Sequence, residues 1–91
     1  MAITVLFTPV SMTTAQYDEI IQRLEQAGAG APEGRLYHVC YGSGDQLRVT
    51  DVWASSETFE RFGQVLMPIL QELGVDPGQP TISPVHNRIA G

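Results

Sequence analysis

The stretch Leu47–Phe62, LRVTDVWASSETFERF, decides the fold, because it reads as a strand, a sharp corner and the start of a helix. Its first part alternates in the period-two pattern of a strand that ends at Trp53. The hydroxyls of Ser55 and Ser56 can then accept hydrogen bonds from the free N–H groups of a helix start. Asp51 shares the face of Trp53, where an apolar residue is expected, so this strand carries a carboxylate to the side that a helix covers.

The composition is that of a small globular protein. A length of 91 residues predicts one domain over 1–91, and 43% hydrophobic with 16% charged residues excludes a disordered chain. No apolar run approaches the ~20 residues that cross a bilayer. The N-terminal sequence lacks the basic start and cleavage site of a signal peptide. Because the single cysteine cannot form an internal disulfide, we expect a cytoplasmic protein.

Charge and motif content exclude several kinds of partner. A net charge of −5 without a basic cluster argues against binding to nucleic acid or to an anionic membrane surface. The two histidines and one cysteine do not have the spacing of metal ligands. No glycine-rich phosphate loop is present either. We therefore expect neither a metal nor an organic cofactor.

The N-terminal third of the chain predicts a strand followed by a helix. Residues 2–8, AITVLFT, are rich in β-branched side chains, and both faces of this strand are at least half apolar, as in a central strand. Thr13 and Gln16 have the spacing of a capping box. The helix that they begin is expected to stop at Gly28, a residue type that favours the C-terminal end of a helix.

The C-terminal part predicts a second helix and a last strand. The helix begins near Ser56, and Pro68 should bend or break it just before the proline, leaving a short helix through Leu73. The last strand covers 81–89, and Pro84 restricts it to an edge of the sheet.

A GSGD turn joins a second strand at 35–41 to the strand described first, so the two form an antiparallel hairpin. With a two-residue loop at 43–44, Leu36 pairs with Asp51, and His38 stands diagonal to that carboxylate. The Cβ atoms of His38 and Asp51 should then lie about 6–8 Å apart. The hairpin therefore places a histidine and an aspartate together on the helix-covered face.

The order strand, helix, strand, strand, helix, strand predicts an α+β, ferredoxin-like fold, with two helices on one face of a four-stranded antiparallel sheet. The opposite face would expose too much apolar surface for a monomer. We therefore expect a homodimer that packs sheet against sheet. The side chains on that face are Leu6, Tyr37, Val39, Tyr41, Thr50 and Val52.

The pattern V-x-D-V-W-x-S-x-E-x-F-x-x-F over 49–62 resembles the dimeric α+β barrel superfamily, and most nearly its antibiotic-biosynthesis-monooxygenase-like group. His38 and the V-H-N at 85–87 are similar to small bacterial members of that group. The resemblance implies a dimer with a cavity in each subunit, between sheet and helices, which in relatives holds an aromatic polyketide, a quinol or haem. Haem-degrading members use an asparagine on the first strand and a histidine on the second helix. Neither occurs at 1–8 or 56–73, so we do not expect haem degradation.

His38 is the candidate catalytic base, because an imidazole gains and loses a proton near neutral pH. Asp51 is the candidate that orients it, as a carboxylate orients the imidazole of a catalytic triad. Both residues also have a structural interpretation. The histidine could be a buried residue bonded to a neighbour, and the carboxylate could anchor Ser55 or Arg35.

The candidate ligand-contacting residues are mostly aromatic. By the resemblance, Trp53 lines the cavity, and its indole has one N–H donor. Tyr17, Phe59 and Phe62 have the helical spacing of core residues as well. Cys40 is predicted to be a small buried hydrophobe, not a nucleophile. The full set of candidate contacts is Trp53, Tyr17, Phe59, Phe62, His86 and Asn87.

These observations leave three functional interpretations. The first is a protein that binds a small molecule, acting as a cofactor-independent monooxygenase or isomerase on an aromatic or quinol-like substrate, with His38 as base and Trp53 holding the ring. The alternative is a non-catalytic dimer that binds a metabolite or serves as an accessory subunit. The third, a purely structural module, predicts that Phe59, Phe62 and Leu66 fill the cavity.

Overall fold

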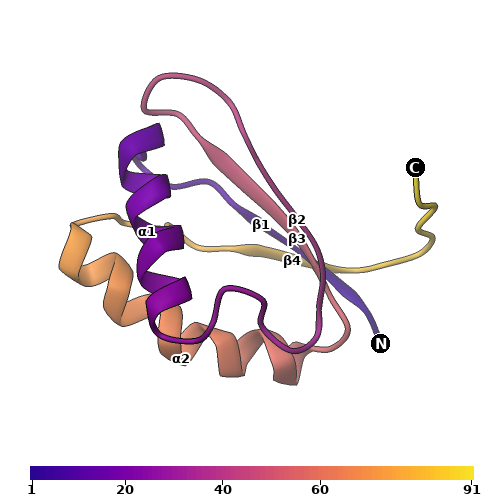
Figure 1. Ribbon diagram of the computed structural model, residues 1–91. Coiled ribbons are helices and arrows are strands. Elements are labelled where there is room, and N and C mark those ends of the chain that lie inside the picture. The colour runs from indigo at the N-terminus through magenta and orange to yellow at the C-terminus, as the bar shows by residue number, and fades with distance from the viewer.

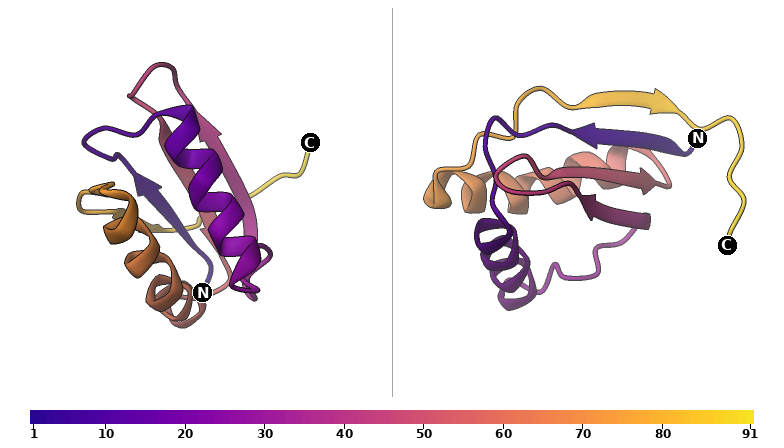
Figure 2. Two further views of the ribbon diagram at one scale, coloured as in Figure 1. Left: turned by 60° about the vertical axis from the view of Figure 1, so that its left-hand side comes forward. Right: turned by 90° about the horizontal axis from the view of Figure 1, so that it is seen from above.

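The computed structural model describes residues 1–91 as one four-stranded sheet with two helices (Figure 1). The strands lie in the order β2-β3-β1-β4, and every neighbouring pair is antiparallel. Both helices cover the same face of the sheet (Figure 2). This is the predicted ferredoxin-like arrangement, which is confirmed. The elements are β1 (Ile3–Phe7), α1 (Thr14–Gln26), β2 (Arg35–Tyr41), β3 (Arg48–Trp53), α2 (Ser56–Leu73) and β4 (Thr81–Pro84).

Side-chain caps begin both helices where the sequence predicts them. The Thr13 hydroxyl accepts a hydrogen bond from the Gln16 backbone N–H at 3.2 Å, and the Gln16 side chain accepts one from the Thr13 N–H at 2.9 Å. The Ser55 hydroxyl accepts from the backbone N–H of Thr58 at 3.2 Å. At its other end α2 stops at Gly74, which adopts the left-handed conformation (φ 68°) that glycine allows at a helix end.

A break before Pro68, one of the two outcomes predicted there, is wrong, because α2 continues without interruption from Ser56 to Leu73. A proline removes one helical hydrogen bond, here to the carbonyl of Gln64. Both residues lie on the exposed side of the helix, where water can solvate that carbonyl. The opposite side is buried through Phe62 and Leu70, and this packing holds the helix in place.

The last strand is shorter than predicted. β4 ends at Pro84, five residues before the expected end at Ile89. Pro84 has no N–H to continue the ladder, and only one further backbone bond follows, from the Val85 N–H to the Ala2 carbonyl at 3.0 Å. The predicted edge position of this strand is confirmed.

The hairpin register also differs from the prediction. The ladder between β2 and β3 begins at Tyr41 and Arg48, so the loop is longer than two residues, and His38 pairs directly with Asp51. The loop residues bond elsewhere: the Met12 N–H donates to the Asp45 carbonyl at 2.7 Å, and the Leu47 N–H donates to the Met12 carbonyl at 3.4 Å. Because the register moves by two residues, the side chains of β2 from Tyr37 to Tyr41 keep their predicted faces.

A β-bulge near the start of β2 changes which side chains face the helices. Arg35 pairs with Trp53 and Tyr37 with Val52, so Leu36 is an extra residue without a partner on β3. The prediction that Leu36 pairs with Asp51 on the covered face is therefore wrong, and Leu36 is 47% exposed.

The chain just before the bulge is tied to the start of α2. The Gly34 carbonyl accepts a hydrogen bond from the Ala54 N–H at 2.7 Å. Gly34 has φ 87°, and a Cβ built there would lie 2.5 Å from the side chain of Thr58. Only glycine can adopt this conformation so close to the helix. Because the chain is fixed at Gly34 and the register is fixed at His38, the extra residue Leu36 has to bulge out of the ladder.

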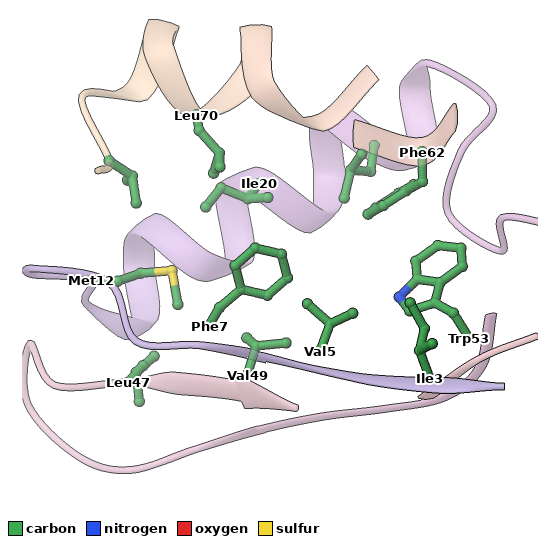
Figure 3. Packing of buried hydrophobic residues seen from close by; sticks show 12 residues of the cluster. Ile3, Val5, Phe7, Met12, Ile20, Leu47, Val49, Trp53, Phe62 and Leu70 are labelled. Carbon is green, nitrogen blue, oxygen red and sulfur yellow. The ribbon is translucent and has the colours of Figure 1, made fainter. Parts of the chain in front are cut away.

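The core lies between the sheet and the helices. It consists of twelve buried apolar residues, contributed by both helices, by β1 and β3, and by the connecting loops (Figure 3). Val5 and Trp53 are fully buried, and the Trp53 ring packs on Phe62 with ring centroids 5.1 Å apart. Asp51 is the one charged residue that is buried, so the core closes over a carboxylate.

The face of the sheet away from the helices is open in the single chain. Tyr37 and Tyr41 are exposed there, and the hydroxyl of Tyr41 lies 3.1 Å from that of Thr50. Val39 and Val52 are half-buried on the same face. The predicted apolar outer face is therefore present.

Neither helix is both long enough and apolar enough to cross a lipid bilayer.

Candidate active site

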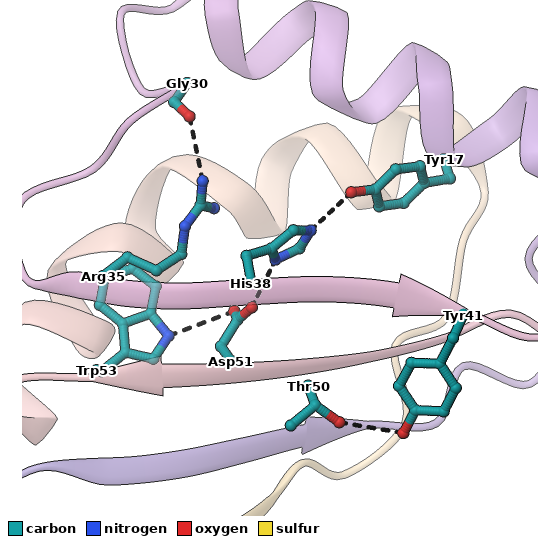
Figure 4. A network of polar contacts seen from close by, with 8 residues as sticks. All are labelled: Tyr17, Gly30, Arg35, His38, Tyr41, Thr50, Asp51 and Trp53. Carbon is teal, nitrogen blue, oxygen red and sulfur yellow. Dashed lines mark hydrogen bonds and ion pairs between the residues drawn. The ribbon is translucent and has the colours of Figure 1, made fainter. Parts of the chain in front are cut away.

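The site is built around the carboxylate of Asp51, which β3 turns toward the helices. Its side chain is 3% exposed. One oxygen lies 2.5 Å from Nδ1 of His38, and the other accepts a hydrogen bond from Nε1–H of Trp53 at 3.3 Å (Figure 4). Each carboxylate oxygen thus has a partner. Asp51 pairs with neither Ser55 nor Arg35, the two anchors that the sequence left open.

His38 connects this carboxylate to helix α1. Its second ring nitrogen, Nε2, lies 2.6 Å from the hydroxyl of Tyr17 (Figure 4). An ionised carboxylate only accepts hydrogen bonds, so Nδ1 carries the proton, and Nε2 of the neutral ring accepts from the phenol. The result is a continuous chain of hydrogen bonds through Tyr17, His38 and Asp51, which we call the relay.

Tyr17 forms the outer end of the relay. α1 places it one turn after the N-terminal cap, where its backbone N–H bonds the Thr13 carbonyl at 2.9 Å. Burial raises the pKa of the Tyr17 phenol above its ordinary value, Cys40 adds to the effect, and Arg35 opposes it. The phenol is therefore protonated at neutral pH and can donate to His38.

The relay can accept and return a proton. When His38 gains a second proton, its imidazolium lies between the Asp51 carboxylate and the Tyr17 oxygen, and the bond to the phenol reverses direction. The carboxylate stabilises that cation and keeps the ring oriented. Because Nε2 is occupied by the phenol, a ligand reaches the imidazole through the Tyr17 oxygen or by displacing it.

A small apolar cavity adjoins the relay. Its volume is about 60 Å³, and eleven of its sixteen lining residues are hydrophobic. Tyr17, His38 and Asp51 all line it. Ligand pockets usually measure about 300–1,000 Å³, so this one holds water or the edge of a ring, and an entering ring has to widen it. Phe62 and Leu66 line this cavity but do not fill it, and Phe59 is not among its lining residues, so the filled cavity that the structural-module interpretation predicts is not seen.

Trp53 lies behind the site and does not line the cavity. It is fully buried, and its ring packs on Phe59 at 5.7 Å and on Phe62 at 5.1 Å between centroids. Its N–H is used by Asp51. In this geometry Trp53 supports the Asp51 carboxylate, whereas the sequence predicted that it would contact the ring of a ligand.

The other predicted contacts are spread out. Phe62 lines the cavity, whereas Phe59 does not line it and packs on the Trp53 ring. His86 and Asn87 are exposed in the segment after β4, away from the residues that line the cavity. Cys40 is half-buried, where the sequence predicted a buried residue, and this burial raises the pKa of its thiol, which keeps it protonated.

Sequence reasoning missed Arg35 as a wall residue of this cavity. Its guanidinium lies 5.9 Å from the centre of the Phe62 ring and donates to the Gly30 carbonyl at 3.2 Å. Strict alternation along β2 places Arg35 on the outer face, and only the bulge brings it inside. The glycine before the arginine was the one local signal of an irregular strand start.

No group of three or more His, Cys, Asp or Glu side chains is arranged to hold a metal ion.

Comparisons with known proteins support the fold. No family model matches the sequence, and no curated protein is similar to it in sequence. A candidate antibiotic biosynthesis monooxygenase from Chloroflexus aurantiacus has a similar structure, with 19% identity, a TM-score of 0.66 and full coverage of both chains. SnoaB, a cofactor-independent oxygenase from Streptomyces nogalater, has 16% identity and a TM-score of 0.62, over 99% of this chain and 96% of its own.

A candidate antibiotic biosynthesis monooxygenase from Deinococcus radiodurans is similar too, with 16% identity and a TM-score of 0.63 over 99% and 97% of the two chains. At such identities the likeness establishes the shared fold and leaves the activity open. The fold predicted from the resemblance to the antibiotic-biosynthesis-monooxygenase-like group is confirmed.

The two histidines of the chain provide a matched test of the relay. Changing His38→Ala leaves the buried Asp51 with the Trp53 N–H as its one protein donor, so we expect a loss of about 1–3 kcal/mol in unfolding free energy. His86→Ala removes an exposed ring and should change stability by less than about 0.5 kcal/mol. Urea titrations of both variants measure the difference, and equal losses would contradict the described network.

Proposed function

We propose that the cavity binds a small aromatic molecule and that the relay of Tyr17, His38 and Asp51 moves a proton to and from it. One observation carries this proposal: an imidazole, oriented by a buried carboxylate and bonded to a phenol, adjoins an apolar cavity. His38 is 21% exposed in its side chain, so the ring can exchange protons with a ligand or with water. A histidine that served only to satisfy Asp51 would not need this access.

The reaction class that fits is removal of a proton from an activated carbon. The Tyr17 oxygen takes the substrate proton while its own proton passes to Nε2 of His38, and Asp51 stabilises the resulting imidazolium. Return of the proton at another carbon is an isomerisation. Reaction of the carbanion with dioxygen is a cofactor-independent oxygenation. SnoaB, which has the same fold, is described as a cofactor-independent oxygenase.

A second candidate function is non-catalytic binding of a metabolite. The observation that favours it is the small volume of the cavity, about 60 Å³, which does not hold a whole substrate ring unless the cavity widens. On this alternative the relay is a structural device that satisfies Asp51, and the protein acts by binding alone.

Proton exchange separates the two candidates. The probe is 2-indanone, a planar ketone whose methylene hydrogens are acidified by both the ring and the carbonyl. In D₂O under argon, we expect the protein to accelerate deuterium incorporation, followed by NMR. Tyr17→Phe should lower the catalysed rate about 100-fold, the usual contribution of a positioned acid–base group. Tyr41→Phe removes a phenol from the exposed face and should leave the rate unchanged.

An exchange rate equal to that in buffer, with 2-indanone bound at the cavity, would contradict catalysis and favour the binding function. Oxygenation is then tested with anthrone, since anthrone and O₂ give anthraquinone and water. Oxygen uptake that matches anthraquinone formation one to one supports an oxygenase. Proton exchange without oxygen uptake supports an isomerase.

We also propose that the protein is a homodimer that buries the outer face of the sheet. Its exposed tyrosines and half-buried valines support this, and stable homodimer interfaces commonly bury about 2,000 Å² or more. Val39→Glu places a charge on that face and should give a monomer in sedimentation velocity. Val65→Glu makes the same change on α2 and should leave the dimer intact. A monomeric wild-type protein at micromolar concentration contradicts this proposal.

A further inference from the structure

The bulge at Leu36 puts Arg35 and His38 on the same face of β2. Residues three apart on a regular strand point to opposite faces. Here Arg35 pairs with Trp53 and His38 with Asp51, and these partners are two residues apart on β3, hence on one face. Arg35 and His38 both line the cavity. Bulges commonly re-aim a side chain beside a functional site, and this one brings the cavity its only arginine.

The guanidinium of Arg35 has no carboxylate partner. Arg23 pairs with Glu19 and Glu72, and Arg61 lies 4.0 Å from Glu33, whereas no such ion pair includes Arg35. The carboxylate that shares its cavity, Asp51, is already bonded to a histidine and a tryptophan.

One Arg35 nitrogen is bonded, to the Gly30 carbonyl at 3.2 Å. A guanidinium has five N–H donors and is always charged, so most of its donor capacity is free. In a chain of net charge −5, the wall of this cavity thus keeps a cation whose charge is not neutralised by an adjacent side chain.

We propose that Arg35 is the anion-binding residue of this cavity, and that its ligand is a planar aromatic compound carrying a carboxylate, phenolate or enolate oxygen. The planar fork of a guanidinium matches such oxygens, by two parallel hydrogen bonds in the case of a carboxylate. The Phe62 ring, 5.9 Å from the guanidinium, offers an apolar surface beside it for the ligand ring.

This inference rests on the proposed function and names the substrate class. In the proton-transfer step a substrate C–H bond breaks, and its proton goes to the Tyr17 oxygen while the phenol proton goes to His38. The electron pair left on carbon delocalises to the carbonyl oxygen, which becomes an enolate. A guanidinium at that oxygen stabilises the charge as it develops. Arg35 would therefore contact the substrate throughout the reaction.

Benzoate and benzamide are the probes, because they have nearly the same shape and only benzoate is charged. Binding is followed by NMR titration, using backbone amide shifts of residues around the cavity. We expect the wild-type protein to bind benzoate about tenfold more tightly than benzamide, as a charge-assisted pair requires. Arg35→Gln should remove this preference by weakening benzoate binding alone. Arg35→Lys keeps the charge and should retain part of it.

Arg61→Gln is the matched control, since Arg61 is a second arginine with an exposed side chain outside the cavity lining. It should leave both affinities unchanged, which shows that the loss in Arg35→Gln is not an effect of net charge. Equal affinity of the wild-type protein for the two probes, or an unchanged preference in Arg35→Gln, overturns the inference while the cavity remains a binding site. Absence of shifts around the cavity with either probe counts against the proposed function itself.

Discussion

The fold depends on satisfying the Asp51 carboxylate inside an apolar core. A buried carboxylate costs several kcal/mol unless hydrogen bonds replace its lost water. The chain supplies two donors, from His38 on the neighbouring strand and from Trp53 two residues along the same strand. No buried side-chain nitrogen or oxygen is left without a partner. The positions of the imidazole and the indole are therefore set by one charge, and the phenol of Tyr17 is set in turn by the imidazole.

The same constraint links the hairpin to the cavity. Pairing of His38 with Asp51 fixes the register of β2 on β3, and the contact of Gly34 with Thr58 fixes the chain just before β2. Between these two points β2 has one residue more than β3, and this extra residue, Leu36, forms the bulge without a partner on β3. The bulge turns Arg35 inward, so a cation and an imidazole–carboxylate pair come to share a small apolar cavity. The hydrogen bonds that stabilise the buried Asp51 carboxylate thus also hold groups in an arrangement suited to acid–base chemistry.

Most of the fold could be predicted from local patterns. Capping residues located both helix starts, and alternation located the strands and put His38 on the face of Asp51. The errors came from interactions that local patterns do not contain. The bridge from Met12 to Gln46 lengthened the hairpin loop, and helix packing overrode Pro68.

At the site, the histidine–aspartate pair was predictable because a charged residue interrupts an apolar face. The sequence did not predict that the Tyr17 phenol bonds His38 or that Arg35 turns toward the cavity, since each depends on tertiary geometry. Trp53 was predicted on the correct face, but its depth behind Asp51 follows from packing on two phenylalanine rings.

The most direct test of the described network is which ring nitrogen of His38 carries the proton when the ring is neutral, measured by ¹⁵N NMR of the histidine side chains. The account predicts a single neutral tautomer with the proton on Nδ1, held by Asp51, and with Nε2 accepting from Tyr17. His86, which is exposed, provides the internal reference of a ring that exchanges between tautomers. A neutral His38 ring with its proton on Nε2, or ¹⁵N shifts averaged between the two tautomers like those of His86, would contradict the described network.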